Sequence, residues 1–211
     1  MTVLFSTEEF ARLKKDLVLF KCALDNMRMR VNVLLEEFMH LQPYNPIEHV
    51  KYRTKSPERI AEKLHRRGFP ITAEAARKNL TDIAGIRCIC SYASDINKLA
   101  DVLRHQPDIK ILKERDYVSR PKESGYRSYH IIIEVPIYLT NSTERLPVEV
   151  QIRTQAMDFW ASLEHKVRYK FNEEMPKSLT RDLRECADKI ADLDGKMFLI
   201  QEIANLTRQK E

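Results

Sequence analysis

Two long stretches at the ends of the chain carry apolar residues at helical spacing. Near the amino terminus the spacing alternates between three and four, through Phe10, Leu13, Leu17, Phe20, Leu24, Met27, Val31, Leu34, Phe38 and Leu41. Ser6 and Glu9 precede this set in the arrangement of a helix capping box. Leu183, Cys186, Ile190, Leu193, Met197, Ile200 and Ala204 repeat the pattern near the carboxyl terminus. Both stretches predict long helices, whose seams fit packing within the chain and an oligomer interface equally well.

The middle of the chain alternates between short apolar runs and polar loops. The runs predict strands at Ile83–Ser91, Ile109–Glu114, Ser128–Ile137 and Pro147–Thr154. Shorter helices are predicted at Pro57–Arg67, at Ile96–His105 and from Ala156 to Val167. This order of elements predicts an α+β fold in which helices flank a mixed sheet.

The length and composition limit the organisation and location of the protein. A chain of 211 residues suits one domain, for which we expect a helical extension at 6–42, a catalytic core at about 46–170 and carboxyl-terminal helices at 178–208. No signal peptide or apolar run of membrane-spanning length is visible, so we expect a cytoplasmic protein without a membrane partner. The four cysteines lack metal-binding spacing, as do the histidines His40, His49, His65, His105 and His165.

Positive charge is concentrated between His49 and Arg67. Seven lysines and arginines in this segment are opposed only by Glu58 and Glu62. The chain has four glycines and no glycine-rich phosphate loop, so side chains and a metal ion would have to hold any nucleoside triphosphate. Charge runs also form solvated helix faces, and that alternative stays open for part of this segment.

Two carboxylates stand out because they accompany apolar strands. In Pro147–Thr154, strict alternation places Val148, Val150 and Ile152 on one face and Glu149, Gln151 and Arg153 on the other. Asp82 begins the next apolar run, where a carboxylate is costly unless it is paired, binds metal or caps a helix. If Asp82 and Glu149 lie close together, they could share a Mg²⁺ ion that bridges triphosphate oxygens.

A third polar group precedes the Glu149 strand. Tyr126, Ser128 and His130 share one face of the predicted strand, which we expect to pair antiparallel with the Glu149 strand. Tyr126 follows Lys122 and Gly125 in a basic loop, and a tyrosine in this setting can stack on a base. The alternative for both Tyr126 and His130 is a structural role, in which their hydrogen bonds are made within the protein.

Four segments in this order resemble the small alarmone synthetases of the RelA/SpoT family. They are Asp82–Arg87 (DIAGIR), Asp116–His130 (DYVSRPKESGYRSYH), Glu149–Thr154 (EVQIRT) and Ala156–Lys166 (AMDFWASLEHK). Asn45–His49 (NPIEH) with Arg53–Ser56 (RTKS) is more similar to the RelP-like group than to the RelQ-like group. The resemblance implies a nucleotidyltransferase-like mixed sheet, a homotetramer formed through the terminal helices, and synthetase activity without the hydrolase domain of longer members.

The resemblance also implies a reaction and its residues. The pyrophosphoryl group of ATP would pass to the 3′-hydroxyl of GDP or GTP, with GMP as a further acceptor, giving (p)ppGpp and AMP. Asp82 and Glu149 would bind Mg²⁺, for which Mn²⁺ could substitute, and Glu149 would also be the general base. The ATP-binding residues would be Arg53, Lys55, Ser56, Lys63, Arg66 and Arg87. The acceptor nucleotide would be held by Arg115, Lys122, Tyr126, His130 and Gln151, with Asp158 either on the guanine edge or capping a helix.

Two rival functions use the same residues differently. A nucleotidyltransferase acting on another acceptor would need the same carboxylates and cations but would release pyrophosphate instead of AMP. A non-catalytic RNA-binding or scaffold protein would account for the basic pI and the heptads, and would tolerate loss of Glu149. The resemblance also allows regulation by product, single-stranded RNA or zinc, but no residue pattern in the sequence indicates any of the three.

Overall fold

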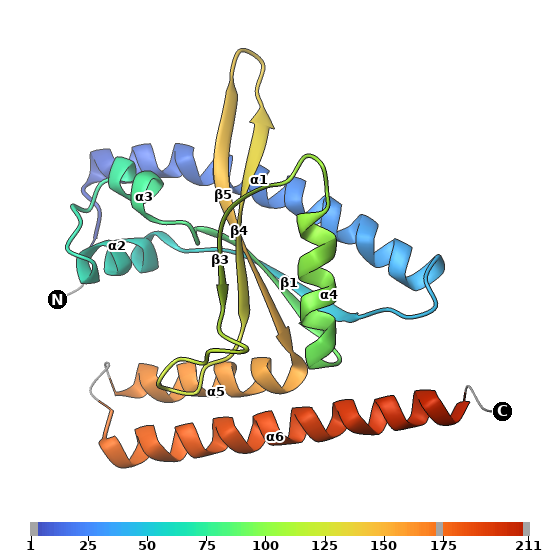
Figure 1. Ribbon diagram of the computed structural model, residues 1–211. Helices are drawn as coiled ribbons and strands as arrows, with labels where there is room; N and C mark the ends of the chain where they lie inside the picture. Colours follow the sequence, from blue (N-terminus) through green and yellow to red (C-terminus); the bar gives the residue numbers. More distant parts are fainter. Residues whose placement is uncertain (1–3, 172–174, 209–211) are drawn as a thin grey trace.

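The structure, a computed structural model, describes residues 4–171 and 175–208. In chain order the elements are α1 (Thr7–His40), β1 (Ile47–Thr54), α2 (Pro57–Arg66), α3 (Ala73–Asn79), β2 (Ala84–Cys90), α4 (Ala93–Arg104), β3 (Lys110–Asp116), β4 (Tyr129–Tyr138), β5 (Thr143–Thr154), α5 (Gln155–Lys170) and α6 (Lys177–Arg208) (Figure 1). The predicted α+β fold with long terminal helices is confirmed.

The five strands form one mixed sheet in the order β1-β2-β5-β4-β3. β2 and β5 are parallel, and the other three pairings are antiparallel. The predicted pairing of the His130 strand with the Glu149 strand is confirmed, because His130 lies opposite Gln151. β5 is therefore a central strand, and its neighbours β2 and β4 bring residues from distant parts of the sequence beside Glu149.

The two faces of the sheet differ in chemistry. Alternate residues such as Ile86, Val150 and Ile131 point to one face, where they form the main hydrophobic core with α1 and α4. The buried seam of α1, which includes Leu13, Phe20, Met27, Val31 and Leu34, packs into this core. The seam of α1 thus serves packing within the chain, and the opposite face of the sheet is left for polar side chains.

The amino terminus of α1 differs in one detail from the predicted capping box. Ser6 Oγ accepts a hydrogen bond from the Glu9 amide at 3.3 Å, as predicted. Glu9 Oε2 instead accepts a hydrogen bond from the Ala73 amide at 2.7 Å, at the start of α3. The carboxylate therefore satisfies a free N–H of a second helix, which only the tertiary fold brings within reach.

The sequence interpretation missed two elements and the start of a third. β1 was described only as a basic segment, although Lys51 and Arg53 alternate with Val50 and Tyr52 on opposite faces of this edge strand. The short helix α3 was also missed. β5 begins at Thr143, before the predicted start at Pro147, so the proline lies inside the strand. Pro147 is tolerated there because β2 pairs only with residues 148–154 and leaves that edge of β5 free.

α5 and α6 lie side by side beneath one end of the sheet, and the β4–β5 hairpin projects from the other end (Figure 1). Trp160 of α5 packs against Leu183, Ala187 and Ile190 of α6. Further along α6, Leu193, Met197, Ile200 and Ile203 are roughly half exposed or more. None of the helices in the described part of the chain is long and apolar enough to cross a membrane.

Candidate functional site

The polar face of the sheet carries several of the predicted site residues. The strand registers place these side chains on one face: Lys51 and Arg53 from β1, Arg87 from β2, Glu149, Gln151 and Arg153 from β5, His130 from β4, and Lys113 and Arg115 from β3. Period-two alternation explains their common orientation, because each lies an even number of residues from its neighbour on the same strand.

Asp82 lies just before β2 and receives two lysines. Its Oδ2 accepts hydrogen bonds from Lys55 Nζ at 2.6 Å and Lys63 Nζ at 2.5 Å. Burial alone would raise the pKa of Asp82, but the two ammonium groups outweigh burial and lower it to about 2. The helix-capping alternative is wrong, since this carboxylate caps none of the helices whose caps the structure describes. Among the described residues, Asp82 Oδ1 finds no hydrogen-bond partner although it is buried.

Glu149 is held by its neighbours on the sheet. Its Oε1 lies 3.1 Å from His130 Nδ1, and its Oε2 accepts a hydrogen bond from Gln151 Nε2 at 2.8 Å. Burial opposes ionisation, but the hydrogen bond and charge of His130 outweigh it, and the pKa of Glu149 is lowered. Glu149 and Asp82 both line a cavity of about 270 Å³, together with His130 and Arg115.

These two carboxylates form a fitting but incomplete site for a divalent cation. The unpartnered Oδ1 of Asp82 is the kind of buried oxygen that a cation would satisfy, and Glu149 is ionised close by. Within the described residues no group of three or more His, Cys, Asp or Glu side chains could hold a metal. An ion at Asp82 and Glu149 would therefore need water or phosphate oxygens as further ligands, which suits Mg²⁺.

Arg153 is the centre of a buried network that sequence analysis did not identify. Its guanidinium donates hydrogen bonds to Gln151 Oε1, Tyr126 Oη and Asp158 Oδ1. Its Cζ also lies 5.0 Å from the centre of the Tyr126 ring. Only 4% of Arg153 is exposed, so it supports the site from within. Its place on the polar face of the Glu149 strand was the signal available in the sequence.

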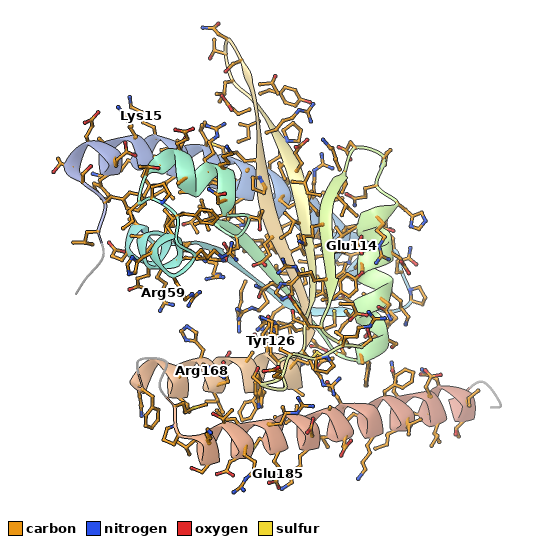
Figure 2. The ribbon with its side chains drawn as sticks, turned by 60° about the vertical axis from the view of Figure 1, so that its left-hand side comes forward. Lys15, Arg59, Glu114, Tyr126, Arg168 and Glu185 are labelled. Atoms are coloured by element: carbon orange, nitrogen blue, oxygen red, sulfur yellow. The ribbon has the colours of Figure 1, made fainter. Side chains whose placement is uncertain are left out.

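Tyr126 lies in an aromatic and cationic cluster at the end of the sheet, above α5 (Figure 2). Its hydroxyl is 2.9 Å from His130 Nε2, and its ring packs edge-on against Tyr117 and His130. Lys122 Nζ lies 4.7 Å from the ring centre of Tyr126 and 4.8 Å from that of Tyr117. The predicted pair Lys122 and Tyr126 is thus brought together, and the cluster adds Tyr117, which the prediction lacked.

Two further candidate residues have structural partners. Ser56 Oγ accepts a hydrogen bond from the Arg59 amide at 3.4 Å and caps α2. Asp158 does not cap α5, because Thr154 does so. The Asp158 carboxylate instead accepts hydrogen bonds from Lys51 and Arg87, at 2.9 and 2.8 Å, in addition to its contact with Arg153. Any guanine edge at Asp158 would have to compete with these cations.

The basic segment borders a cavity of about 630 Å³, which lies between the sheet, α2 and α5. In Figure 2, Arg59 extends from α2 on the side that faces α5. Arg59 Nη1 lies 3.3 Å from His165 Nε2 of α5, a histidine to which the sequence assigned no role. The predicted residues that line the cavity are Arg53, Lys55, Lys63, Arg66, Asp82, Arg87, Tyr126 and Gln151. Its volume is sufficient for a nucleotide.

The geometry therefore offers a cavity rich in cations that Asp82 and Tyr126 both line, a smaller cavity that Asp82 shares with Glu149, and an aromatic cluster that reaches Glu149 through His130. The cations suit phosphates and the aromatic rings suit a base. Lys122, Arg115 and His130 contact the tyrosines of this second region. Arg53 and Arg87 lie on neighbouring strands and line a small cavity in common, which is the arrangement expected of two residues that hold one flat group.

Comparisons with known proteins agree with this arrangement. The family model described as a region found in RelA and SpoT proteins matches residues 52–174. The GTP pyrophosphokinase YwaC of Bacillus subtilis is 47% identical over 189 residues, which are 90% of each chain. The GTP pyrophosphokinase YjbM of the same organism is 32% identical over 185 residues, 88% of this chain and 86% of YjbM. The chain is thus markedly nearer to YwaC than to YjbM.

Solved structures give the same result. The small alarmone synthetase 2 of B. subtilis superposes with a TM-score of 0.81 at 46% identity, covering 90% of this chain and 97% of that one. The small alarmone synthetase 1 of B. subtilis, bound to its product pppGpp, superposes with a TM-score of 0.85 at 30% identity, covering 90% and 97%. The expected nucleotidyltransferase-like fold of small alarmone synthetases is confirmed. Because the family model covers more than half of its residues and these relatives match most of its length, the chain belongs to the RelA/SpoT family.

Proposed function

We propose that this chain transfers the β,γ-pyrophosphoryl group of ATP to the 3′-hydroxyl of GDP or GTP, giving ppGpp or pppGpp and AMP. The observation that carries the proposal is the position of Asp82 and Glu149, two ionised carboxylates that share one cavity, which adjoins the cationic cavity at Asp82 and the aromatic cluster at His130. Each region suits one nucleotide, and the carboxylates lie where the two nucleotides would meet. The similarity to GTP pyrophosphokinases over most of the chain supports the same reaction.

ATP would occupy the large cavity. Arg53 and Arg87 would hold the adenine between their flat guanidinium groups, which stack well on aromatic faces. Lys55, Lys63 and Arg66 line the same cavity and would neutralise the triphosphate. Ser56 would contribute through its position at the amino terminus of α2, where free N–H groups favour an anion.

The acceptor nucleotide would bind at the aromatic cluster. Guanine would stack on the face of Tyr126 that Lys122 covers in the free protein, so the ammonium would be released toward the acceptor phosphates. Arg115 would hold the phosphates, and His130 and Gln151 would steady the nucleotide beside Glu149. Asp158 would reach the guanine edge only by giving up one of its cation partners.

Glu149 would act as the general base. Its carboxylate is ionised at neutral pH and would accept the proton of the 3′-hydroxyl as that oxygen attacks the β-phosphorus of ATP. A Mg²⁺ ion at Asp82 and Glu149, for which Mn²⁺ could substitute, would supply charge stabilisation for the transferring phosphates when bound. Lys55 and Lys63 hold Asp82 in place before any ion arrives.

The proposal is tested by incubating the purified chain with Mg²⁺, ATP and GDP and resolving the nucleotides by anion exchange. We expect AMP and a guanosine tetraphosphate in equal amounts, and pppGpp when GTP replaces GDP. Release of pyrophosphate without AMP would instead identify a nucleotidyltransferase. Persistence of added ppGpp would agree with synthesis without hydrolysis, whereas its breakdown to GDP would contradict that part of the proposal.

Replacing Tyr126 by Ala tests the acceptor site. Loss of base stacking is worth about 1–3 kcal/mol, so we expect the KM for GDP to rise by roughly 10- to 100-fold. The KM for ATP should rise by a smaller factor, because the cations that would hold ATP, such as Arg53 and Arg87, lie elsewhere in the large cavity that Tyr126 borders. Steady-state kinetics with each nucleotide varied measures both. Tyr126→Phe keeps the ring and loses only the hydroxyl contacts with His130 and Arg153, and an equally large effect in this variant would contradict stacking.

We also propose that the chain forms a homotetramer through its terminal helices. Leu193, Met197, Ile200 and Ile203 form an exposed apolar stripe on α6 that no part of the described chain covers. The cytoplasmic location stays a prediction from the sequence. No specific contact among the described residues favours regulation by single-stranded RNA.

The assembly can be checked by light scattering coupled to size-exclusion chromatography. We expect a tetramer for the wild type and a smaller species for a chain with Met197→Glu and Ile200→Glu, because two charges would be buried in the interface. Asn205→Glu adds the same charge at an exposed position outside the heptad seam and should leave the assembly unchanged. A wild-type monomer at micromolar concentration would contradict the proposal.

A further inference from the structure

The acceptor loop, residues 117–126, lies directly against helix α6. Gly125 has a φ of +88°, and a Cβ added there would meet Ala187 Cβ of α6 at 2.4 Å. The loop backbone therefore approaches α6 more closely than any residue with a side chain would allow. A turn in which the Gly125 amide donates to the Lys122 carbonyl at 2.8 Å shapes this part of the loop.

Arg184 of α6 connects the helix to the loop. Its Nη1 donates hydrogen bonds to the carbonyl oxygens of Glu123 at 2.9 Å and of Lys122 at 3.2 Å. These carbonyls belong to the turn that connects Lys122 to Tyr126 along the chain. One guanidinium thus fixes the backbone between the two acceptor-binding side chains without contacting the place where the nucleotide would lie.

Contacts other than those of Arg184 also hold α6 in place. Trp160 Nε1 donates to the Leu183 carbonyl at 2.9 Å, and Thr154 Oγ1 donates to Asp194 of the same helix. Trp160 and Ala187 also pack together in a small buried cluster against which Tyr126 rests. Loss of the Arg184 side chain would therefore release the loop while leaving α6 on the sheet end.

We propose that Arg184 is a positioning residue for the acceptor nucleotide, which it serves by holding the acceptor loop in its binding conformation. The inference rests on the proposed function and deepens it. Ordering a loop residue costs about 1–2 kcal/mol of conformational entropy, so a loop ordered in advance binds its nucleotide more tightly than one that must be ordered on binding. The helix supplies this order through Arg184 and the close contact at Gly125.

The kinetic test compares the wild type with Arg184→Ala. Two lost hydrogen bonds correspond to about a tenfold rise in the KM for GDP, while the KM for ATP stays within about twofold. Arg184→Lys, which keeps a donor near the loop, should recover part of the affinity. Asp188→Ala removes the ion pair of Arg184 but not its bonds to the loop, and Arg181→Ala changes a highly exposed arginine on the same helix. Both controls should match the wild type.

Hydrogen exchange of the nucleotide-free protein provides a readout that does not need activity. We expect amides of residues 117–126 to exchange about tenfold faster in Arg184→Ala, whereas α5 and α6 keep the wild-type rates. Unchanged loop exchange, an unchanged KM for GDP, or equal rises in both KM values with faster exchange in α6 would overturn the inference. An inactive wild-type chain would overturn the proposed function, while an active one with a normal Arg184→Ala variant would overturn this inference alone.

Discussion

Glu149→Gln is expected to lower the rate of ppGpp formation by about three orders of magnitude or more, because the variant loses both the proton acceptor and a metal ligand. The amide has nearly the same shape as the carboxylate but cannot take the 3′-hydroxyl proton. The oxygen of the new side-chain amide can still accept a hydrogen bond from His130 or Gln151, so the fold should persist. Product formation is measured by anion exchange at saturating ATP and GDP.

The matched control is Glu144→Gln on the same strand. Glu144 lies at the hairpin end of β5, where it pairs with Arg77 on the outside of the site. We expect this control to keep wild-type activity and both variants to unfold near the wild-type temperature. Activity of Glu149→Gln within tenfold of the wild type would remove Glu149 from the role of base and would favour the scaffold or RNA-binding alternative.

Asp82→Asn is expected to reduce activity by about 10²-fold or more and to change the acid sensitivity of the fold. The activity falls because a neutral amide is a poor ligand for a divalent cation and no longer holds Lys55 and Lys63 toward the phosphates. The acid sensitivity changes because the pKa of Asp82 is lowered from 3.8 to about 2 in the folded protein. The ionised carboxylate therefore stabilises the fold fully above its unfolded pKa, and this contribution is lost as the pH falls through the folded pKa.

The sign of the pH effect follows from this lowered pKa. The contribution of Asp82 is fully present above about pH 4 and is lost as the pH falls toward 2, and it amounts to about 2 kcal/mol. The wild-type free energy of unfolding should accordingly fall more steeply between pH 4 and 2 than that of Asp82→Asn, as measured by urea titration without metal. Asp192→Asn, which changes an exposed aspartate on α6, serves as the control. Parallel curves for the wild type and Asp82→Asn would contradict the assigned pairing.

The elements with clear periodicity could be predicted from the sequence. Helix α1, the strands β2, β3 and β4, and the helices α4, α5 and α6 all appear at the predicted places, with bounds that differ by a few residues. The alternation around Glu149 also predicted correctly which residues share the polar face of β5. These predictions held because a period of two or 3.6 reflects burial against the core, which is a local property of each segment.

Short or charged elements gave a weaker signal. β1 has apolar residues on only one face and basic residues on the other, and α3 is only seven residues long. The sequence also did not show what covers the two long apolar seams, because the heptads of α1 and α6 look alike. The structure separates them: α1 is buried on the sheet, whereas part of the α6 seam is exposed. Heptad spacing shows that a face is apolar but not what covers it.

The tertiary structure alone decided which charges meet. Asp82 receives lysines 19 and 27 residues away, and Asp158 receives Lys51 from 107 residues away. Motif positions cannot specify such pairs, because strand order and helix placement set the distances. The same holds for Arg153 beneath Tyr126 and for Arg184 on the acceptor loop. The sequence thus determined which residue types the site contains, and packing of distant elements determined their partners, their ionisation and the order of the loop that would hold the acceptor.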